Sequence, residues 1–528
     1  MQEWIEQELE TFDCGDKRLN KRVKKLTDSL SRKPTLSIPG SCEGWAETIA
    51  AYRFFDNEKV AFDSVLSPHK DSTLKRIQEY EVVLMVQDTT EIDITRPNEH
   101  MIGAGPMNDN SRIGFFAHPS LTLTEDGIPL GVVGADIWSR DKDEFARNQK
   151  DKKEKMRKKR QKPIEEKESY RWVQNYRQAC EIQSQSPNTK IVNISDSEGD
   201  IYECFAESVN EDIEDKAEWI VRGCQDRSLS GGEKGNYPKL LDELSSSEIL
   251  GEVDITVSKN EPKSHDNRKR KQFRSARTAT ASIQAKKVEL KAPFRKGKKL
   301  PNVEMNAVLV REINPPEDES PVEWLLLTSL SIDTTTDVRT VIEYYCKRWQ
   351  IEIFFRVLKS GCKVEERQLE TEDRYKPCLA LYMIIAWRIM FVMMLGRECP
   401  DIPCDTVLSE SEWKSVYQIR KHKELPQQVP TLHEMVCIIA GLGGYLGRKH
   451  DGQPGPQTMW IGMQRMMDFA QAWRVFGPNS EFGKGGQLCV VVVGIPVSRH
   501  PPHRPGRAVF PHPVPRLYSF PRRLILAQ

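Results

Sequence analysis

The chain has 528 residues, of which 38% are hydrophobic and 29% are charged. The hydrophobic fraction excludes a wholly disordered chain, and the charged fraction excludes a protein embedded mostly in a membrane. Lys and Arg number 78 against 77 Asp and Glu, so the formal net charge is only +1. Taken as a total, this near-zero charge argues against a nucleic-acid partner.

The charge is unevenly distributed along the chain, however. Residues 147–162 contain ten Lys or Arg and two acids, residues 263–299 contain fourteen and two, and residues 485–528 contain six and none. The remainder of the chain is therefore acidic. Basic blocks on an acidic body indicate a polyanion-binding surface beside a cation-binding one, with solvated basic loops as the alternative for each block.

The cysteine pattern and the apolar segments predict a soluble cytoplasmic protein. The twelve cysteines include no C-x-x-C pair, which favours free thiols over disulfides or structural zinc. The first ten residues are acidic and lack the apolar core of a signal peptide. The apolar run 378–395 carries Arg388 in its middle, which favours a helix buried among other helices over a membrane span.

Hydrophobic periodicity gives the order of the elements along the chain. Residues 1–75 are predicted to be helical, and Trp45, Ile49 and Tyr52 are spaced for one helix face. A mixed sheet with helical cover is predicted next, with a helix over 170–182 and strands at 82–87, 114–124, 130–137, 190–195 and 218–222.

The second half of the chain changes from strands to helices. Residues from about 226 to 332 are predicted to be rich in strands, and one continuous helix is predicted over 335–359, ending at Gly361. Helical segments are expected to follow as far as about residue 477. The segment 485–528 has eight prolines and no acid, which suggests an out-of-frame or read-through extension.

Two aspartates stand where catalytic acids often lie, at the exit of a buried strand. Asp88 follows VVLMVQ, and Asp196 follows KIVNIS. Ligands of open α/β sheets collect outside the carboxyl ends of the strands. The alternative is that each aspartate caps a turn or helix, although Asp196 is followed by Glu198 and Asp200, and capping hardly explains all three acids.

The helix predicted over 335–359 carries the third group of candidate residues. Tyr345, Arg348, Glu352 and Lys359 fall within about 60° of arc at a rotation of about 100° per residue. Arg356 lies on the same side. A carboxylate that holds a divalent cation, cations that hold phosphate oxygens and an aromatic ring together suit chemistry on a phosphodiester. The alternative is an exposed face with an i,i+4 salt bridge between Arg348 and Glu352.

Three segments together carry a family resemblance: VQDTT at Asp88, ISDSEGD at Asp196, and YCKRWQIEIFFRVLKSG around Glu352. The chain resembles the DDE transposases of the IS-four insertion-sequence family, whose Y-R-E-K signature is complete in Tyr345, Arg348, Glu352 and Lys359. The resemblance covers residues 1 to about 477. The segment 485–528 matches nothing in the family pattern.

The resemblance implies an α/β fold with a ribonuclease H-like catalytic core and four regions. They are a helical DNA-binding domain at 1–75, the core at 76–370 with its β-rich insertion at about 226–332, a helical dimerisation region at 371–480, and the atypical tail at 481–528. Asp88, Asp196 and Glu352 are then expected to bind two Mg²⁺ ions, for which Mn²⁺ can substitute.

The resemblance also implies contacts to DNA. Trp324 is expected to stack on a flipped base, although packing in the core is the alternative for this residue alone. Arg222, Tyr345 and Arg348 are expected to grip neighbouring phosphates, with Lys359 and Arg356 near the cleavage site. Cations of the N-terminal region suit the phosphates of inverted repeats: Arg18, Arg22, Lys24, Lys25, Arg32 and Lys33.

The predicted function is cut-and-paste transposition in the bacterial cytoplasm, in association with the nucleoid. The chain is expected to act as a homodimer in a synaptic complex, through about residues 455–477. It would nick the transposon ends by Mg²⁺-dependent hydrolysis, form and reopen hairpins, and join the 3′-hydroxyl ends to target DNA. The alternatives are a catalytically impaired inhibitor that still binds DNA, and a ribonuclease H-like nuclease that cleaves branched DNA.

Overall fold

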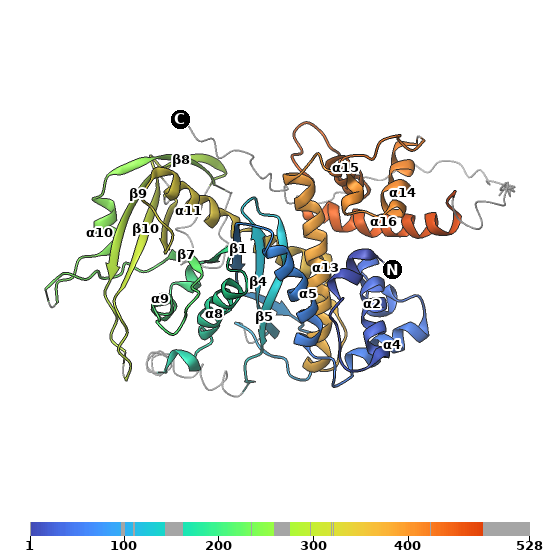
Figure 1. Cartoon of the computed structure of the whole chain (residues 1–528), viewed down its shortest axis with the longest axis horizontal. Coiled ribbons are helices and arrows are strands. Elements are labelled where there is room, and N and C mark those ends of the chain that lie inside the picture. The colour runs from blue at the N-terminus through green and yellow to red at the C-terminus, as the bar shows by residue number, and fades with distance from the viewer. Residues whose placement is uncertain are drawn as a thin grey trace, which may run out of the picture.

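The computed structural model describes residues 2–96, 101–108, 111–142, 162–233, 235–257, 275–295, 297–317, 319, 321–422 and 424–478. Most of the basic block 147–162, much of the block 263–299 and the tail after residue 478 lie outside the described residues. Within these ranges the chain forms one large mixed sheet with helices on both faces and further helices at both ends of the chain (Figure 1).

The N-terminal region is helical, as predicted. Its helices are α1 (Glu3–Glu8), α2 (Lys17–Arg32), α3 (Ile38–Ser41), α4 (Trp45–Phe55) and α5 (Phe62–Ile77). Helix α2 is strongly amphipathic: it buries Val23, Leu26 and Leu30, while its Lys and Arg side chains lie on the other face. Asp16 caps this helix by accepting a hydrogen bond from the backbone N–H of Arg18.

The sheet contains eleven strands in the order β2-β4-β1-β6-β7-β11-β10-β9-β8, with β3 and β5 also paired to β4. Its central strands β1, β6 and β7 are parallel, while β4 runs antiparallel to β1. The strands of the first half are β1 (Val82–Gln87), β2 (Thr90–Asp93), β3 (Gly105–Pro106), β4 (Ile113–Thr124), β5 (Pro129–Trp138), β6 (Lys190–Ser195) and β7 (Glu218–Gly223).

The predicted β-rich segment adds four strands to the same sheet. Its strands are β8 (Ile249–Val257), β9 (Arg277–Leu290), β10 (Val303–Glu312) and β11 (Glu323–Thr328). Strand β11 pairs antiparallel with β7, so β8–β10 extend the sheet outward, as Figure 1 shows at one edge of the molecule. The short helix α10 (Leu240–Ser245) precedes β8.

Alternate residues of the central strands belong to two separate cores. Leu84 and Val86 pack with helices α11 (Thr335–Lys347), α12 (Gln350–Arg356) and α13 (Glu372–Glu398). Val83 and Met85 pack instead with α8 (Tyr170–Gln185) and α9 (Tyr202–Ser208). Burial on both faces explains why β1 is apolar from Val82 to Val86 and why β6 is mostly apolar. It also fixes which face each strand-end side chain points to.

The predicted continuous helix over 335–359 is interrupted in the structure, and the expectation was wrong in this respect. Helix α11 (Thr335–Lys347) ends just before Arg348, α12 (Gln350–Arg356) follows, and a π-helical turn spans Val357–Gly361. The backbone N–H groups of Arg348 and Glu352 bond three residues back, at 3.0 and 3.1 Å, where the helix tightens. Residues 345 and 352 therefore lie on two helical segments.

The apolar run 378–395 lies in the long helix α13 (Glu372–Glu398). By length and composition α13 could span a membrane, but 83% of its apolar window is buried inside the protein. Arg388, in its middle, donates a hydrogen bond of 2.5 Å to the carbonyl of Val407 and lies 5.6 Å from the Trp4 ring. Helix α13 is thus the central helix of the core, as the sequence predicted.

Helix α13 also connects the two ends of the described chain. It contacts α2, α4 and α5 on one side and α15 (Leu432–Leu442) and α16 (Pro456–Phe476) on another, while α14 (Glu410–Lys421) packs on α15 and α16. Helix α16 also touches α2 directly. The apolar core is accordingly continuous from Ile5 in α1 to Trp460 in α16.

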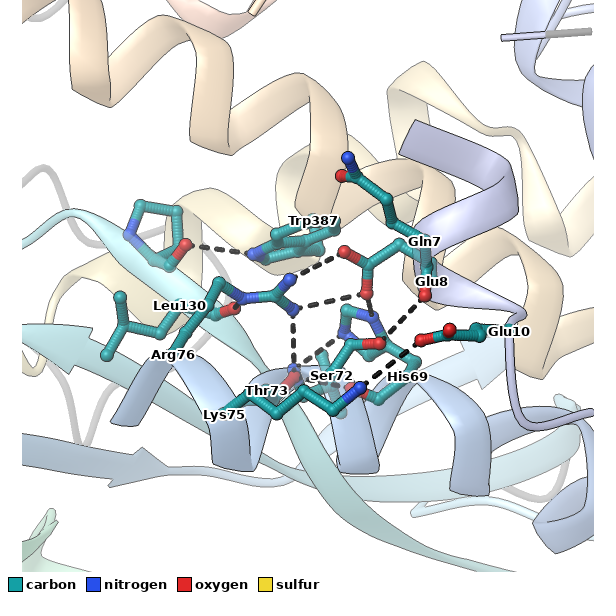
Figure 2. A network of polar contacts seen from close by, with 12 residues as sticks. Gln7, Glu8, Glu10, His69, Ser72, Thr73, Lys75, Arg76, Leu130 and Trp387 are labelled. Atoms are coloured by element: carbon teal, nitrogen blue, oxygen red, sulfur yellow. Dashed lines mark hydrogen bonds and ion pairs between the residues drawn. The ribbon is translucent and has the colours of Figure 1, made fainter. Parts of the chain in front are cut away.

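A buried polar network lies between α1, α5, β5 and α13 (Figure 2). Arg76 donates a 2.6 Å hydrogen bond to Glu8 and lies 4.6 Å from the Trp387 ring. His69 Nδ1 lies 2.5 Å from the same carboxylate, and His69 Nε2 accepts the N–H of Val132 at 3.0 Å. This accepted bond requires an unprotonated Nε2, so His69 is neutral and donates to an ionised Glu8. Burial lowers the pKa of His69 accordingly.

Candidate active site

The central strands bring three predicted site residues to one level of the sheet. Val86 on β1 pairs with Ile194 on β6, and Ser195 on β6 pairs with Val221 on β7. If the register of β1 and β6 is extended by two residues, Asp88 lies beside Asp196. If the register of β6 and β7 is extended by one residue, Asp196 lies beside Arg222. Adjacent strands are about 4.8 Å apart, and side chains at one level point to one face. That face is the one covered by α11, α12 and α13.

Asp88 is largely buried, with 14% of its side chain exposed. Its carboxylate accepts the backbone N–H of Thr89 at 2.7 Å and a hydrogen bond from Arg348 Nη1 at 2.9 Å. Burial, followed by the negative charge of Asp196, raises the pKa of Asp88 to about 7, although the positive charge of Arg348 opposes this shift. Asp88 therefore lies in a site that is crowded with negative charge.

Arg348 connects the strand ends to Glu352. The Glu352 carboxylate is 3.9 Å from Arg348 Nη1, which also bonds to Asp88, and 39% of the Glu352 side chain is exposed. The i,i+4 salt bridge proposed as an alternative thus exists, but its arginine faces the sheet and is only 13% exposed. The break after Lys347 places Arg348 at the end of α11, next to β1.

Asp196 combines capping with its place beside Asp88. Its Oδ1 accepts the N–H of Glu198 at 2.8 Å and caps the short turn Ser197–Gly199. Asp200 has a structural role: it is buried, accepts the N–H of Cys224 at 2.8 Å, and pairs with Arg227. Capping and ion pairing therefore account for part of the DSEGD cluster.

Trp324, Tyr345 and Arg222 form the adjoining part of the site. The rings of Trp324 and Tyr345 meet edge to face with centroids 6.0 Å apart. Burial raises the pKa of Tyr345, and the charges of Arg222 and Arg348 lie close enough to its hydroxyl to oppose that shift. Trp324 is part-buried and packs against the core. Its ring therefore takes part in core packing, the alternative given from the sequence, and also keeps some exposed surface.

Lys359 and Arg356 lie further along the same polypeptide segment. Lys359 Nζ is 3.4 Å from both Thr90 Oγ1 and the Glu365 carboxylate, which places it beside the start of β2. Arg356, at the end of α12, is exposed to solvent. The structure therefore brings Lys359 close to the Asp88 segment and leaves Arg356 on the surface.

Sequence reasoning missed three side chains that support the strand ends on the opposite face. Arg171 at the start of α8 donates to Thr89 Oγ1 at 3.0 Å and to Glu198 Oε2 at 2.9 Å. The same Thr89 hydroxyl lies 2.9 Å from Nδ1 of the fully buried His118. The only local signal in the sequence was the Thr that follows Asp88 in VQDTT. The other two residues are 30 and 83 positions away from Asp88 in the chain.

The carboxylates suit a hard divalent cation by their chemistry. Oxygen ligands are those that Mg²⁺ prefers, and a cation would relieve the repulsion from Asp196 that adds to burial in raising the pKa of Asp88. Over the described ranges, however, no group of three or more His, Cys, Asp or Glu side chains is already gathered as a metal site. In this structure the guanidinium of Arg348 lies against Asp88 instead.

Three family models match consecutive parts of the chain. A transposase DNA-binding model matches residues 1–60, a transposase DDE domain model matches 138–386, and the Tn5 transposase dimerisation domain model matches 384–483. The chain belongs to the DDE transposase family. This confirms the predicted resemblance to the DDE transposases of the IS-four family, and the dimerisation match makes the chain similar to the transposase of transposon five.

Family membership and the central sheet together confirm the predicted fold class, because a DDE domain implies a ribonuclease H-like core with divalent-metal chemistry. Asp196 and Glu352 lie inside the matched DDE segment, whereas Asp88 lies before it. The place of Asp88 in the transposase site therefore depends on the sheet register and on its contact with Arg348.

One solved structure similar to this transposase is the piggyBac transposase synaptic complex with hairpin DNA. The two share 8% sequence identity over 62% of this chain and 51% of that chain, with a TM-score of 0.29. The match thus spans about half the length of that protein. Likeness at this level is too low to carry a statement about fold or function.

Proposed function

We propose that this chain is a cut-and-paste DNA transposase that cleaves transposon ends and joins them to target DNA. One observation carries the proposal. Asp88 and Asp196 directly follow the neighbouring strands β1 and β6, and Arg348 contacts both Asp88 and Glu352 of α12. These residues lie near the carboxyl end of the central strands, where α/β proteins place their ligands, which supports a site for DNA and metal there.

Asp88, Asp196 and Glu352 are the residues that would hold the metal, as two Mg²⁺ ions. Bound there, divalent cations activate the attacking oxygen and stabilise the leaving oxygen of a phosphodiester. Mn²⁺, a similar oxygen-seeking ion, would substitute. Asp88 must lose its proton to serve as a ligand, which its raised pKa makes sensitive to pH near neutrality.

The remaining residues would position DNA. Arg348 and Arg222 present guanidinium groups, which match the geometry of phosphate oxygens, next to the carboxylates. Trp324 lies at the edge of this group with its ring against Tyr345, where it would stack on a base turned out of the duplex. Lys359 would hold the strand near the cleaved bond, and exposed Arg356 would contact DNA further out.

The DNA-binding and dimerisation matches support the partners of this reaction. The cationic face of α2 suits the phosphates of terminal inverted repeats, with Arg18 94% exposed. A homodimer in a synaptic complex would hold two ends together, with the helix α16 region at its interface. The bacterial cytoplasm, near the nucleoid, is the compartment that fits these partners.

The test is incubation of the full chain with Mg²⁺ and DNA that carries the element's own terminal repeats. We expect nicked ends, hairpin ends and strand-transfer products on denaturing gels. Glu352→Ala should abolish all three, by a factor of at least about 10³, because a metal ligand is lost, while repeat binding in gel shifts stays within a few-fold of wild type.

Two other outcomes would replace the proposal. Repeat binding by the wild-type chain without any cleavage would identify a DNA-binding inhibitor of transposition. Nicking without hairpins or joining would identify a structure-specific nuclease. Loss of repeat binding in Glu352→Ala would show that α12 is needed for the DNA-binding structure itself, and would remove Glu352 from the catalytic set.

A further inference from the structure

Arg171 touches both of the backbone segments that carry the strand-end aspartates. Its Nε donates to Thr89 Oγ1 at 3.0 Å, and the N–H of Thr89 donates to Asp88 at 2.7 Å. Its Nη2 donates to Glu198 Oε2 at 2.9 Å, and the N–H of Glu198 donates to Asp196 at 2.8 Å. One rigid guanidinium thus connects the two carboxylates through a single residue on each side.

The Arg171 side chain is held in place from several directions. It is only 12% exposed, lies 5.2 and 5.4 Å from the rings of Trp138 and Trp172, and donates from Nη1 to the carbonyl of Glu168 at 2.7 Å. A cation in the first turn of a helix is unfavourable, because the helix dipole is positive at that end. Arg171 occupies such a position in α8. Its contacts outside the helix therefore explain its place, because it does not stabilise the helix itself.

His118 contacts the same Thr89 hydroxyl through its Nδ1. Gln87 donates a hydrogen bond from its amide N–H to Asn193 Oδ1 at 2.9 Å, so the Gln87 amide oxygen faces His118 and accepts a hydrogen bond from His118 Nε2–H at 2.9 Å. A neutral imidazole with its proton on Nε2 accepts at Nδ1, which means that the Thr89 hydroxyl donates to it. Burial, assisted by the charge of Arg171, lowers the pKa of His118 well below its ordinary value. Thr89 is thereby fixed between a donor and an acceptor.

We infer that Arg171 is a positioning residue that sets the separation of Asp88 and Asp196, acting with Thr89 and His118. The inference rests on the proposed function, in which these aspartates bind divalent cations. Outer residues that orient metal ligands typically contribute a factor of about 10–100 in metal affinity or activity. Arg171 makes no direct bond to either aspartate among those described, so its effect would pass through Thr89 and Glu198.

Arg171 could act on the metal site through its positive charge or through its positioning contacts, and these two roles predict opposite effects on metal binding when Arg171 is replaced. A cation near the site repels Mn²⁺, so removing the charge alone would tighten binding. Loss of the positioning contacts would weaken binding instead. Arg171→Lys keeps the charge but cannot span Thr89 and Glu198 with a planar fork, whereas Arg171→Gln loses both. The two variants together therefore separate the two roles.

The experiment titrates the purified full chain with Mn²⁺, read by electron paramagnetic resonance, and follows cleavage of element-end DNA against Mn²⁺ concentration. We expect Arg171→Gln and Arg171→Lys both to raise the Kd for Mn²⁺ by about 10–100-fold. The matched control is Arg177→Gln on the same helix, where Arg177 pairs with Glu207 at 2.8 Å. It should leave Mn²⁺ affinity and cleavage unchanged.

A second pair of variants keeps the test decisive if the arginine variants fold poorly. Thr89→Val removes the hydroxyl at constant shape and should weaken Mn²⁺ binding in the same range, and Thr89→Ser should restore it. Thr122→Val, which removes another buried threonine hydrogen bond in β4, is its control for stability. Thermal denaturation should place Thr89→Val and Thr122→Val at similar midpoints.

Three results would overturn the inference. They are wild-type affinity in both arginine variants, tighter binding in Arg171→Gln with wild-type binding in Arg171→Lys, or wild-type affinity in Thr89→Val. Asp88→Ala distinguishes failure of the proposed function itself: if that variant still binds Mn²⁺ and cleaves DNA normally, the aspartate site is not the metal site, whatever the arginine variants do.

Discussion

At the scale of single residues, Asp88 shows how strongly its surroundings change a common side chain. It lies in a buried position beside Asp196, and its pKa rises from 3.8 to about 7. The folded protein therefore binds a proton on this carboxyl that the unfolded chain releases above about pH 4. A raised carboxyl pKa costs stability as the pH rises through this window, in contrast to an aspartate whose pKa is lowered on folding.

This shift predicts the pH dependence of stability without metal. In EDTA, the midpoint of thermal unfolding of Asp88→Asn should exceed that of the wild type increasingly from about pH 4 to about pH 7 and then level off, because only the wild type must ionise a buried group. A shift of about three pKa units corresponds to at most about 4 kcal/mol. Excess Mg²⁺ at pH 8 should stabilise the wild type and not the variant.

The comparison is between two proteins that share every other titrating group, so it isolates Asp88. A difference in midpoint that stays constant from pH 4 to pH 8 would contradict the raised pKa. Equal stabilisation of both proteins by Mg²⁺ would show that the ion binds elsewhere.

At the scale of elements, the strands were the most predictable part of the fold. Strands β1 and β6 have the predicted limits because each is a mostly apolar run that is followed directly by an aspartate. The break between α11 and α12 could not be predicted, since nothing in the local pattern shows that Arg348 is drawn toward Asp88. Arg171 and His118 were missed for the same reason: their roles come from tertiary contacts alone.

Helices α15 and α16 provide a prediction about packing. A side chain at Gly462 in α16 would overlap the backbone oxygen of Ile439 in α15, and a carbonyl cannot turn away as a side chain can. Gly462→Val should therefore lower the free energy of unfolding by about 1–3 kcal/mol or more, measured by chemical denaturation.

The control for this packing effect is Gly455→Ser at the start of the same helix. An added Cβ at Gly455 meets nothing within 4 Å, and serine is a favourable residue before a helix. Gly455→Ser should leave stability unchanged or slightly raise it. A neutral Gly462→Val would mean that α15 and α16 can separate without cost.

At the scale of the whole molecule, the N-terminal helices share one core with the helices that follow the catalytic sheet. Apolar contacts continue from Ile5 to Trp460, and the network in Figure 2 joins α1 to α5, β5 and α13. Burial alone would raise the pKa of Glu8, but His69 and Arg76 overcome this and lower it, so the carboxylate is charged. The protein should accordingly unfold as one cooperative unit over these regions.

Glu8→Gln tests this coupling. The substitution leaves the guanidinium of Arg76 without its charged partner, and breaking a buried pair typically costs about 3–5 kcal/mol. We expect scanning calorimetry to show one transition at a lower temperature. Glu10→Gln is the control, because its pair with Lys75 is exposed and contributes about 0–1 kcal/mol. A separate early transition in Glu8→Gln would show that the N-terminal helices unfold on their own.

The contact between Arg348 and Asp88 would couple metal binding to DNA binding in the proposed reaction. While the guanidinium holds Asp88, it competes with a metal ion for the same oxygen. A DNA phosphate that attracts Arg348 would release the carboxylate, and by reciprocity a bound ion would free Arg348 for phosphate. Metal and DNA would then bind with positive cooperativity, so that a transposase without a transposon end would bind metal less tightly and have less capacity to cut chromosomal DNA at random.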